Sequence, residues 1–206
     1  MFFKIKNICP YCEEKIKGNV ACSYCSKVLK TLINKHIGKT KDCNFFTAPF
    51  IYKNIVRDAI LNFKFKQNIS FCSSFCSFMA TSITNNFDIL VCVPTFDEKF
   101  NPSKEIAKKL KKKLKIKFCK DSVVKIKKTK HQHNCKLSQR LVNLKNAFKA
   151  DNKKLKDKKV LICDDVITTS STIQEISYAC KQAGAKYVGA IAFAISEQLS
   201  KEKYIV

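Results

Sequence analysis

The sequence predicts an α/β domain with a mostly parallel sheet and helices on both faces, preceded by a short cysteine-rich segment. Short apolar runs alternate with amphipathic stretches from residue 46 onward, as in parallel α/β proteins. Residues 1–45 are polar, show little periodicity and contain two C-x-x-C pairs. The chain has 206 residues, of which 46% are hydrophobic, enough for one domain with its own core. We therefore expect two parts, 1–45 and 46–206.

The first half of the α/β part contains two predicted strands and three predicted helices. The apolar runs 46–52 and 89–93 are the strands, and Pro94 ends the second. Apolar residues at helical spacing predict the first two helices. These residues are Ile55, Val56, Ala59, Ile60 and Phe63, then Phe71, Cys72, Phe75, Cys76, Met79 and Ile83. The third helix begins near Asn101-Pro102-Ser103, and its solvent face is almost entirely lysine.

The second half repeats the alternation after a long polar stretch. A short strand is predicted over 123–126, followed by a loop over 127–146. Long loops without regular structure in compact domains are often functional. Another strand is predicted over 160–163 and a last one over 187–195. Between them, apolar residues at helical spacing predict a helix that ends at Gly184.

The net charge of +24 is unevenly distributed. Residues 96–159, called the basic belt below, hold 23 basic and 6 acidic residues, whereas residues 160–206 hold 4 and 5. A phosphate backbone or an acidic ligand would be attracted to such a belt. However, only Arg57 and Arg140 are arginines, and dedicated nucleic-acid binders favour arginine. The abundance of Lys, Asn, Ile and Phe is typical of an A/T-rich genome, so a simple solvated face stays open as the alternative.

Twelve cysteines could indicate a secreted disulfide scaffold, but the rest of the sequence favours a reducing compartment. The chain start has no apolar run of signal-peptide length, and no stretch reaches transmembrane length. We therefore expect a cytoplasmic protein without membrane insertion, in which paired cysteines serve metal or redox chemistry rather than disulfides.

Four of the twelve cysteines form a candidate metal site. Two turns that each present two thiolates would enclose one tetrahedral Zn²⁺, which would tie together a segment too small to bury a core. We therefore expect 1–45 to be a zinc ribbon with a structural Zn²⁺. Its ligands would be Cys9, Cys12, Cys22 and Cys25.

The run 160–172, VLICDDVITTSST, predicts a ligand site. Asp164 and Asp165 follow an apolar strand, and ligands bind at the carboxyl ends of strands in parallel sheets. The turn and the helix start offer backbone N–H groups to an anion. The carboxylates suit sugar hydroxyls or Mg²⁺. Five hydroxyl side chains add donors: Thr168, Thr169, Ser170, Ser171 and Thr172. The plainer alternative is two exposed acids before a helix cap.

This run resembles the phosphoribosyl-pyrophosphate motif of type I phosphoribosyltransferases. That motif consists of an apolar strand, two acids, two apolar residues and then T-T-G-x-T. Ser170 stands where the family usually has glycine. If that position needs a left-handed backbone, serine costs about 1 kcal/mol. Thr168 stands where purine-salvage enzymes usually carry an acidic base, and threonine cannot act as that base. The resemblance therefore disfavours a hypoxanthine or guanine transferase.

A zinc ribbon in front of such a domain resembles the ComF family of competence-associated proteins. Residues 61–65 resemble the end of a family helix with its terminal lysine, Lys64. Val93-Pro94 with Phe100-Asn101 resembles a second family segment. A third is matched by Thr129, Gln132, Gln139, Arg140, Asn143, Ala147 and Phe148.

The ComF resemblance implies a cytoplasmic role in DNA uptake during natural transformation. It also implies phosphoribosyl pyrophosphate as ligand together with Mg²⁺, and catalytic roles for Asp164 and Asp165. Arg140 either closes over a phosphate of the ligand or is a solvated charge of the loop, and both readings stay open. Single-stranded DNA and other DNA-uptake proteins are the implied partners. Two functions stay open, a Mg²⁺-dependent transferase and a non-catalytic ligand sensor that binds single-stranded DNA or a protein partner. Asp97 and Glu98, where the family has basic residues, favour the second. The run 164–172 favours the first, or a ligand site that both functions share.

Overall fold

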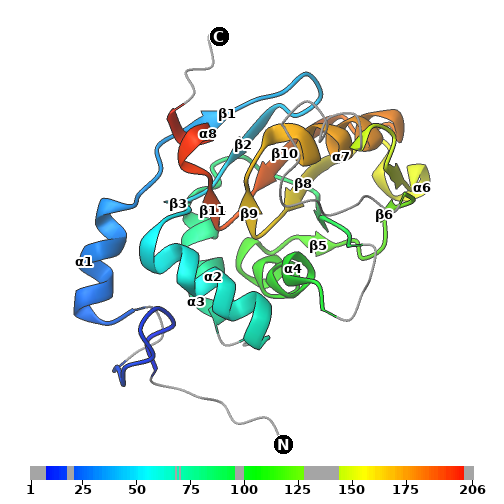
Figure 1. Ribbon diagram of the computed structural model, residues 1–206. Helices are drawn as coiled ribbons and strands as arrows, with labels where there is room; N and C mark the ends of the chain where they lie inside the picture. The colour runs from blue at the N-terminus through cyan, green and yellow to red at the C-terminus, as the bar shows by residue number, and fades with distance from the viewer. Residues whose placement is uncertain are drawn as a thin grey trace, which may run out of the picture.

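The central element of the fold is a six-stranded sheet with the order β1-β2-β10-β8-β4-β5. It is seen in a computed structural model that describes residues 8–17, 21–67, 69, 71–95, 100–127 and 144–201 (Figure 1). All neighbouring strands run parallel except β1, which is antiparallel to β2. The strands are β1 (Ile37–Gly38), β2 (Phe45–Thr47), β10 (Tyr187–Ile191), β8 (Lys159–Cys163), β4 (Ile89–Cys92) and β5 (Lys117–Phe118).

Helices cover both faces of this sheet, which confirms the predicted fold class. On one face, α2 (Asn54–Lys66), α3 (Phe71–Thr81) and α4 (Pro102–Leu114) share a buried apolar cluster with Leu90 and Leu161. On the other face, α7 (Ser170–Gln182) shares a second cluster with Val91 and Ile162. The alternation of neighbouring strand residues between two apolar clusters explains why these strands read as continuous apolar runs.

A second, three-stranded parallel sheet has the order β3-β11-β9. Its strands are β3 (Phe50–Ile51), β11 (Ala194–Ile195) and β9 (Val166–Ile167). The predicted single strands 46–52 and 187–195 are therefore wrong, because each is split into two strands that belong to different sheets. Pro49, which has no N–H to donate, lies in the first break, and in the second break the N–H of Phe193 donates to the carbonyl of Asp165. A continuous apolar run does not reveal such a break.

The basic belt contains a two-stranded antiparallel ribbon of β6 (Val123–Lys125) and β7 (Phe148–Ala150). The short strand predicted at 123–126 is confirmed. Of the loop predicted at 127–146, residues 128–143 lie outside the described residues. Three short helices were not predicted: α1 (Ser23–Thr31), α6 (Asn152–Leu155) and α8 (Glu197–Lys201).

The N-terminal part packs against the α/β part. Leu29 and Leu32 belong to the same apolar cluster as α2 and α3. The buried Tyr11 hydroxyl lies 3.1 Å from the hydroxyl of Ser74 in α3. β1 extends the main sheet beside β2. The division near residue 45 stays a prediction, but the contacts show that the two parts share one core. Among the described residues, no helix has the length and apolar character needed to cross a membrane.

Candidate functional site

The loop between β8 and α7 brings the predicted hydroxyl residues together at the carboxyl end of the main sheet. Thr169 is the N-cap residue of α7, and its side chain makes no capping hydrogen bond. The first N–H groups of the helix therefore lack a side-chain acceptor, which is the usual arrangement for binding an anion. Thr168 is exposed and Thr169, Ser170 and Thr172 are half-buried, whereas Ser171 is buried.

Ser170 carries no left-handed backbone cost. It is the first residue of α7, and it is not among the described non-glycine residues with positive φ. The substitution of serine for the usual glycine is therefore compatible with this loop.

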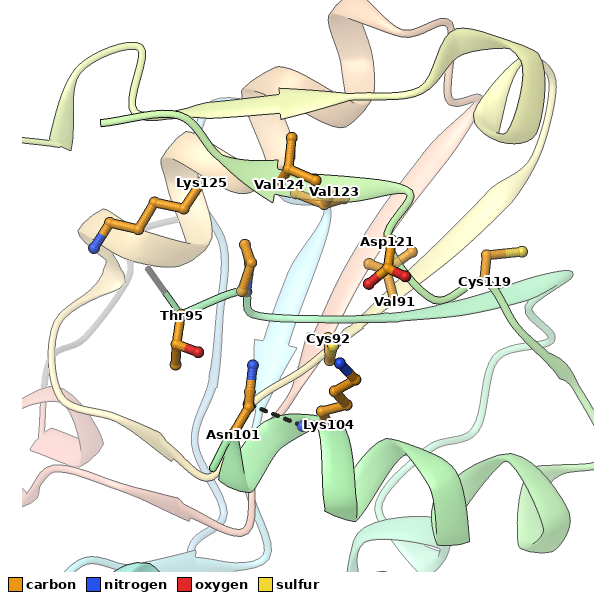
Figure 2. Close-up of a pocket in the computed structure, with 11 residues that line it drawn as sticks. Val91, Cys92, Thr95, Asn101, Lys104, Cys119, Asp121, Val123, Val124 and Lys125 are labelled. Carbon is orange, nitrogen blue, oxygen red and sulfur yellow. Dashed lines mark hydrogen bonds between the residues drawn. The ribbon is translucent and has the colours of Figure 1, made fainter. Parts of the chain in front are cut away.

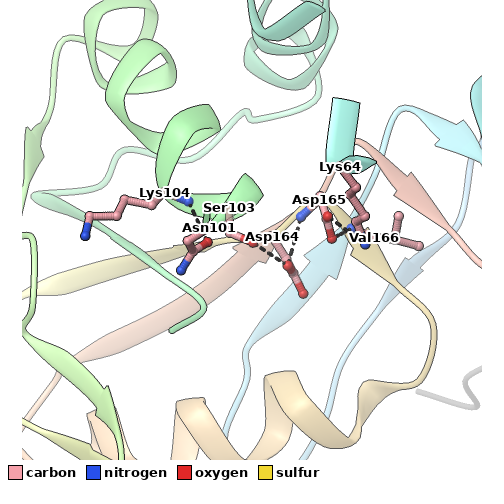
Figure 3. Close-up of polar contacts among 7 residues, drawn as sticks. All are labelled: Lys64, Asn101, Ser103, Lys104, Asp164, Asp165 and Val166. Carbon is pink, nitrogen blue, oxygen red and sulfur yellow. Dashed lines mark hydrogen bonds and ion pairs between the residues drawn. The ribbon is translucent and has the colours of Figure 1, made fainter. Parts of the chain in front are cut away.

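Asp164 sits directly after β8 and is half-buried. Its Oδ1 accepts hydrogen bonds from the Ser103 hydroxyl at 2.7 Å and from the N–H of Asp165 at 2.8 Å. The other carboxylate oxygen points away from these donors (Figure 3). Burial and the neighbouring Asp165 carboxylate raise the pKa of Asp164 to about 7, although the two hydrogen bonds and Lys64 act in the opposite direction.

Asp165 is held differently from Asp164. It is buried, and Lys64 from the last turn of α2 places its ammonium nitrogen 2.8 Å from Oδ2 (Figure 3). The N–H of Val166 donates to Oδ1 at 2.7 Å. Burial alone would lower the pKa of Lys64, but the Asp165 carboxylate outweighs it and raises that pKa. The two acids thus differ. Asp165 is paired with a cation, whereas Asp164 directs one carboxylate oxygen away from its protein donors.

Lys64 and Ser103 were not predicted as site residues. The sequence showed Lys64 only as the end of a helix in a family resemblance and Ser103 only as part of a helix start. Asn101, which is buried, fixes the start of α4 by accepting from the N–H of Lys104 and donating to the carbonyl of Val93. Its position explains how Ser103 reaches Asp164. Of the other predicted positions, Arg140, Asp97 and Glu98 lie outside the described residues.

The four predicted metal ligands also come together. The sulfur atoms of Cys9, Cys12, Cys22 and Cys25 all lie within 4.8 Å of one another. A tetrahedral zinc site with Zn–S bonds of about 2.3 Å has sulfurs roughly 3.8 Å apart, so this set fits Zn²⁺. Backbone N–H groups of Cys22 and Cys25 donate to the sulfurs of Cys9 and Cys22, each at 3.3 Å, which favours thiolates.

Comparison with known families agrees with this arrangement. The family described as "Phosphoribosyl transferase domain" matches residues 58–205, which include Lys64, Ser103 and the whole loop 164–172. The chain belongs to this phosphoribosyl transferase family. The cysteine cluster lies before the matched range of the phosphoribosyl transferase domain. No curated protein matches the chain.

Solved structures resemble this phosphoribosyl transferase domain at low identity. One, described as the allosteric regulatory enzyme of purine biosynthesis, has 18% identity and a TM-score of 0.43, and the match covers 60% of this chain and 25% of that one. Glutamine phosphoribosylpyrophosphate amidotransferase from B. subtilis has 16% identity and a TM-score of 0.43, with 60% and 26% covered. The chain thus spans about a quarter of the length of these two proteins. Adenine phosphoribosyltransferase from Thermoanaerobacter pseudethanolicus has 17% identity and a TM-score of 0.41, with 82% and 84% covered.

Proposed function

We propose that this phosphoribosyl transferase domain binds phosphoribosyl pyrophosphate with Mg²⁺ at Asp164 and the loop 168–172. Following the ComF resemblance, we further propose a cytoplasmic role in DNA uptake during natural transformation. The observation that carries the ligand proposal is the loop at the carboxyl end of β8, where an outward carboxylate oxygen lies beside an uncapped helix N-terminus. The competence role is supported by the sequence resemblance and by the four-cysteine cluster in front of the domain.

Each part of the loop has a role in this proposal. The N–H groups at the start of α7 and the hydroxyls of Thr168, Thr169, Ser170 and Thr172 donate to the ligand's phosphate. Ser171 is buried, and in this proposal it contributes its backbone N–H in the first turn of α7. Asp164 accepts from a ribose hydroxyl. Asp165, tied to Lys64, holds the loop and offers its remaining lone pairs. Arg140 is proposed to close over the diphosphate.

The residues present fit Mg²⁺. Mg²⁺ in proteins is usually held by one or two carboxylates together with substrate phosphates, and Asp164 directs one oxygen away from its protein donors. When bound, Mg²⁺ neutralises the negative charge of the diphosphate and so assists its departure from the ribose.

A thermal unfolding experiment tests the ligand proposal. Phosphoribosyl pyrophosphate with Mg²⁺ should raise the melting temperature, because a ligand at a hundredfold excess over Kd stabilises the native state by about 2.7 kcal/mol. Asp164→Asn should abolish the shift. Asp157→Asn is the matched control, since that acid is exposed before the amino end of β8. An unchanged melting temperature of the wild type at millimolar ligand contradicts the proposal.

The competence role needs a separate test. The chain should restore DNA uptake to a transformable bacterium that lacks its ComF protein, and the Asp164→Asn variant should not. Failure of the wild type to restore transformation, at normal protein levels, would contradict the role but not the ligand site.

A second candidate is a non-catalytic ligand sensor that binds single-stranded DNA or a protein partner. The observation that favours it is the solvent face of α4, where Lys108, Lys112 and Lys113 are exposed. Lysines on such a face neutralise phosphates without reading bases. A pyrophosphate-release assay across candidate acceptors separates the two functions. Release that depends on Asp164 establishes the transferase, and ligand binding without release establishes the sensor.

A further inference from the structure

The two C-x-x-C pairs place their tyrosines in different surroundings. Tyr11 is the third residue of the first pair (9–12), and Tyr24 is the third residue of the second pair (22–25). Tyr11 is 7% exposed and belongs to the apolar cluster of α2 and α3, whereas Tyr24 is 68% exposed. Of the two turns, the first therefore packs its tyrosine into the core that it shares with the α/β part.

The buried end of Tyr11 contacts helix α3. Its hydroxyl lies 3.1 Å from the hydroxyl of Ser74, which is 1% exposed, so one of the two groups donates to the other away from water. Such a contact requires both partners, because a buried hydroxyl that loses its partner destabilises the structure. The turn 9–12 is thus attached to α3 by a specific hydrogen bond as well as by apolar packing.

The next residue of α3, Phe75, packs against residues on both sides of the Lys64–Asp165 ion pair. Its ring lies edge-on to Phe63, with ring centres 5.7 Å apart, and stacks on Phe193 with centres 3.8 Å apart. Phe63 directly precedes Lys64 in α2. The N–H of Phe193 donates to the carbonyl of Asp165 at 3.1 Å. All three rings are fully buried, and close-packed interiors transmit displacement, so a shift of α3 here would disturb the ion pair.

The same set of rings also reaches the start of α4. Phe63 packs edge-on against Phe100, with ring centres 5.6 Å apart. Phe100 directly precedes Asn101, whose side chain caps the first turn of α4 (Figure 2). In that turn Ser103 donates to Asp164. Both carboxylates of the proposed ligand site are therefore supported by rings that contact α3.

A metal ion at the four cysteines would fix the turn 9–12 at both ends. The four sulfur atoms lie within 4.8 Å of one another, and thiolates this close repel each other unless a cation lies between them. Loss of the ion therefore loosens the turn and weakens the contact of Tyr11 with Ser74. An exposed ion pair between Glu13 and Lys66, at 3.4 Å, joins the same two parts, but exposed pairs contribute little. The buried contact of Tyr11 is thus the stronger link.

We propose that metal binding at the four cysteines and ligand binding at the loop 164–172 are coupled through Tyr11. The metal-loaded turn holds α3, and α3 holds Lys64 and the two carboxylates in the geometry that binds phosphoribosyl pyrophosphate. This coupling rests on the proposed function and on the zinc expected at the cysteines. Coupling between two binding sites is reciprocal, so the ligand should tighten zinc binding by the same factor, about tenfold.

The first test is calorimetric titration of the zinc-loaded full chain with phosphoribosyl pyrophosphate and Mg²⁺. Tyr11→Ala keeps the four cysteines but should weaken ligand binding about tenfold. Tyr11→Phe keeps the ring and should weaken binding about threefold, which serves if the alanine variant does not fold. Tyr24→Ala is the matched control, because Tyr24 holds the same place in the other pair and is exposed, and it should bind as the wild type does.

The second test measures the reciprocal effect as competition for zinc between the full chain and a chromogenic chelator. The ligand should tighten zinc binding about tenfold in the wild type and in Tyr24→Ala, and much less in Tyr11→Ala. Asp164→Asn shows whether the ligand acts from its site, since the ligand should not change zinc affinity in this variant.

The outcomes separate the coupling from the proposed function. Ligand binding that is equal in Tyr11→Ala and the wild type, or a zinc affinity that the ligand leaves unchanged, overturns the coupling and leaves the proposed function standing. The same change of zinc affinity in Asp164→Asn as in the wild type also overturns the coupling alone. A zinc-loaded wild type that does not bind phosphoribosyl pyrophosphate overturns both.

Discussion

Lys64 connects the last turn of α2 to a buried carboxylate from a distant part of the chain. Its ammonium nitrogen lies 2.8 Å from Oδ2 of Asp165, whose N–H in turn holds Oδ1 of Asp164. A lysine in this position fixes the shape of the acidic pair without contacting the outward oxygen of Asp164. We therefore expect it to act as a positioning residue for ligand binding.

Lys64→Met should weaken phosphoribosyl pyrophosphate binding at least tenfold, because it leaves Asp165 buried without its cation. It should also destabilise the fold by about 3 kcal/mol, the usual cost of removing one partner of a buried pair. Lys64→Arg should recover ligand binding in part. Lys66→Met is the control, since Lys66 lies on the same turn in an exposed pair with Glu13. Binding equal to that of the wild type in Lys64→Met, measured by titration, would refute the positioning role.

The raised pKa of Asp164 predicts a pH dependence with a definite sign. Folding raises the pKa of Asp164 from its ordinary value of 3.8 to about 7, so the folded state holds this proton more tightly than the unfolded state. This contribution to stability is present at low pH and is lost as the pH rises toward 7. The wild type should therefore lose about 1 to 2 kcal/mol relative to Asp164→Asn between pH 5 and pH 8, allowing for partial exposure. Denaturant unfolding at both pH values measures this difference; parallel changes in the two proteins would contradict it.

At the scale of single elements, α4 carries two different faces. Ile106, Ala107 and Leu110 are buried in the core, while its solvent face presents a row of lysines in the basic belt. Asn101 fixes the helix start, so one helix both positions Ser103 for the site and displays the lysines.

Charge reversal of Lys111, Lys112 and Lys113 to glutamate should weaken binding of single-stranded DNA and flatten its salt dependence, since fewer counterions are released. The stability of the fold should change little, because Lys112 and Lys113 are exposed and Lys111 is half-buried. Titration of a labelled oligonucleotide at rising salt measures both effects. Lys27, Lys30 and Lys35 reversed in the same way, outside the basic belt, provide the control. Absence of wild-type binding at 100 mM salt, or binding unaffected by the α4 reversal, would leave the belt as a solvated face.

The breaks within the predicted strands 46–52 and 187–195 are a feature of the secondary structure that the sequence did not predict. The apolar runs predicted β2, β4, β8 and β10 of the main sheet, but not the edge strands β1 and β5 or the order of the strands. The helices α2, α3, α4 and α7 were predicted from their helical periodicity. The passage of the chain from β2 to β3 and from β10 to β11, which belong to the second sheet, was not predicted, because both segments stay apolar across the break. The acidic pair was visible as a motif, whereas the Lys64 contact depends on how α2 packs and has no local signal.

At the scale of the whole molecule, the cysteine segment and the α/β part share one core. Tyr11 lies between two of the cysteines in sequence, and its buried hydroxyl contacts Ser74. Cys9, Cys25, Leu29 and Leu32 belong to the apolar cluster of α2 and α3. Loss of metal at the cysteines should therefore affect more than the segment itself.

Metal analysis should find near one Zn²⁺ per chain, and Cys22→Ser should lose it. Because the segment packs on the main core, this variant should also lower the melting temperature of the whole protein in a single transition and expose the segment to protease. Cys180→Ser is the control, since Cys180 is a buried residue of α7 in the second apolar cluster, away from the four cysteines. A metal-free protein that resists protease as well as the zinc-loaded one would rule out a structural zinc.

The proposed ligand site is built from residues that lie far apart in the sequence, which matters for folding during synthesis. Ser103 and Asp164, which meet at 2.7 Å, are separated by 61 positions along the chain, and Lys64 lies farther still from Asp165. Contacts of such long range form late, after the loops between them have closed. Under the proposed function, the chain can therefore bind its ligand only after the final third has been synthesised and has packed against the rest. The proposed ligand should therefore bind the full chain and not a chain truncated before Asp164, even though the truncated chain already holds the four cysteines and the first helices.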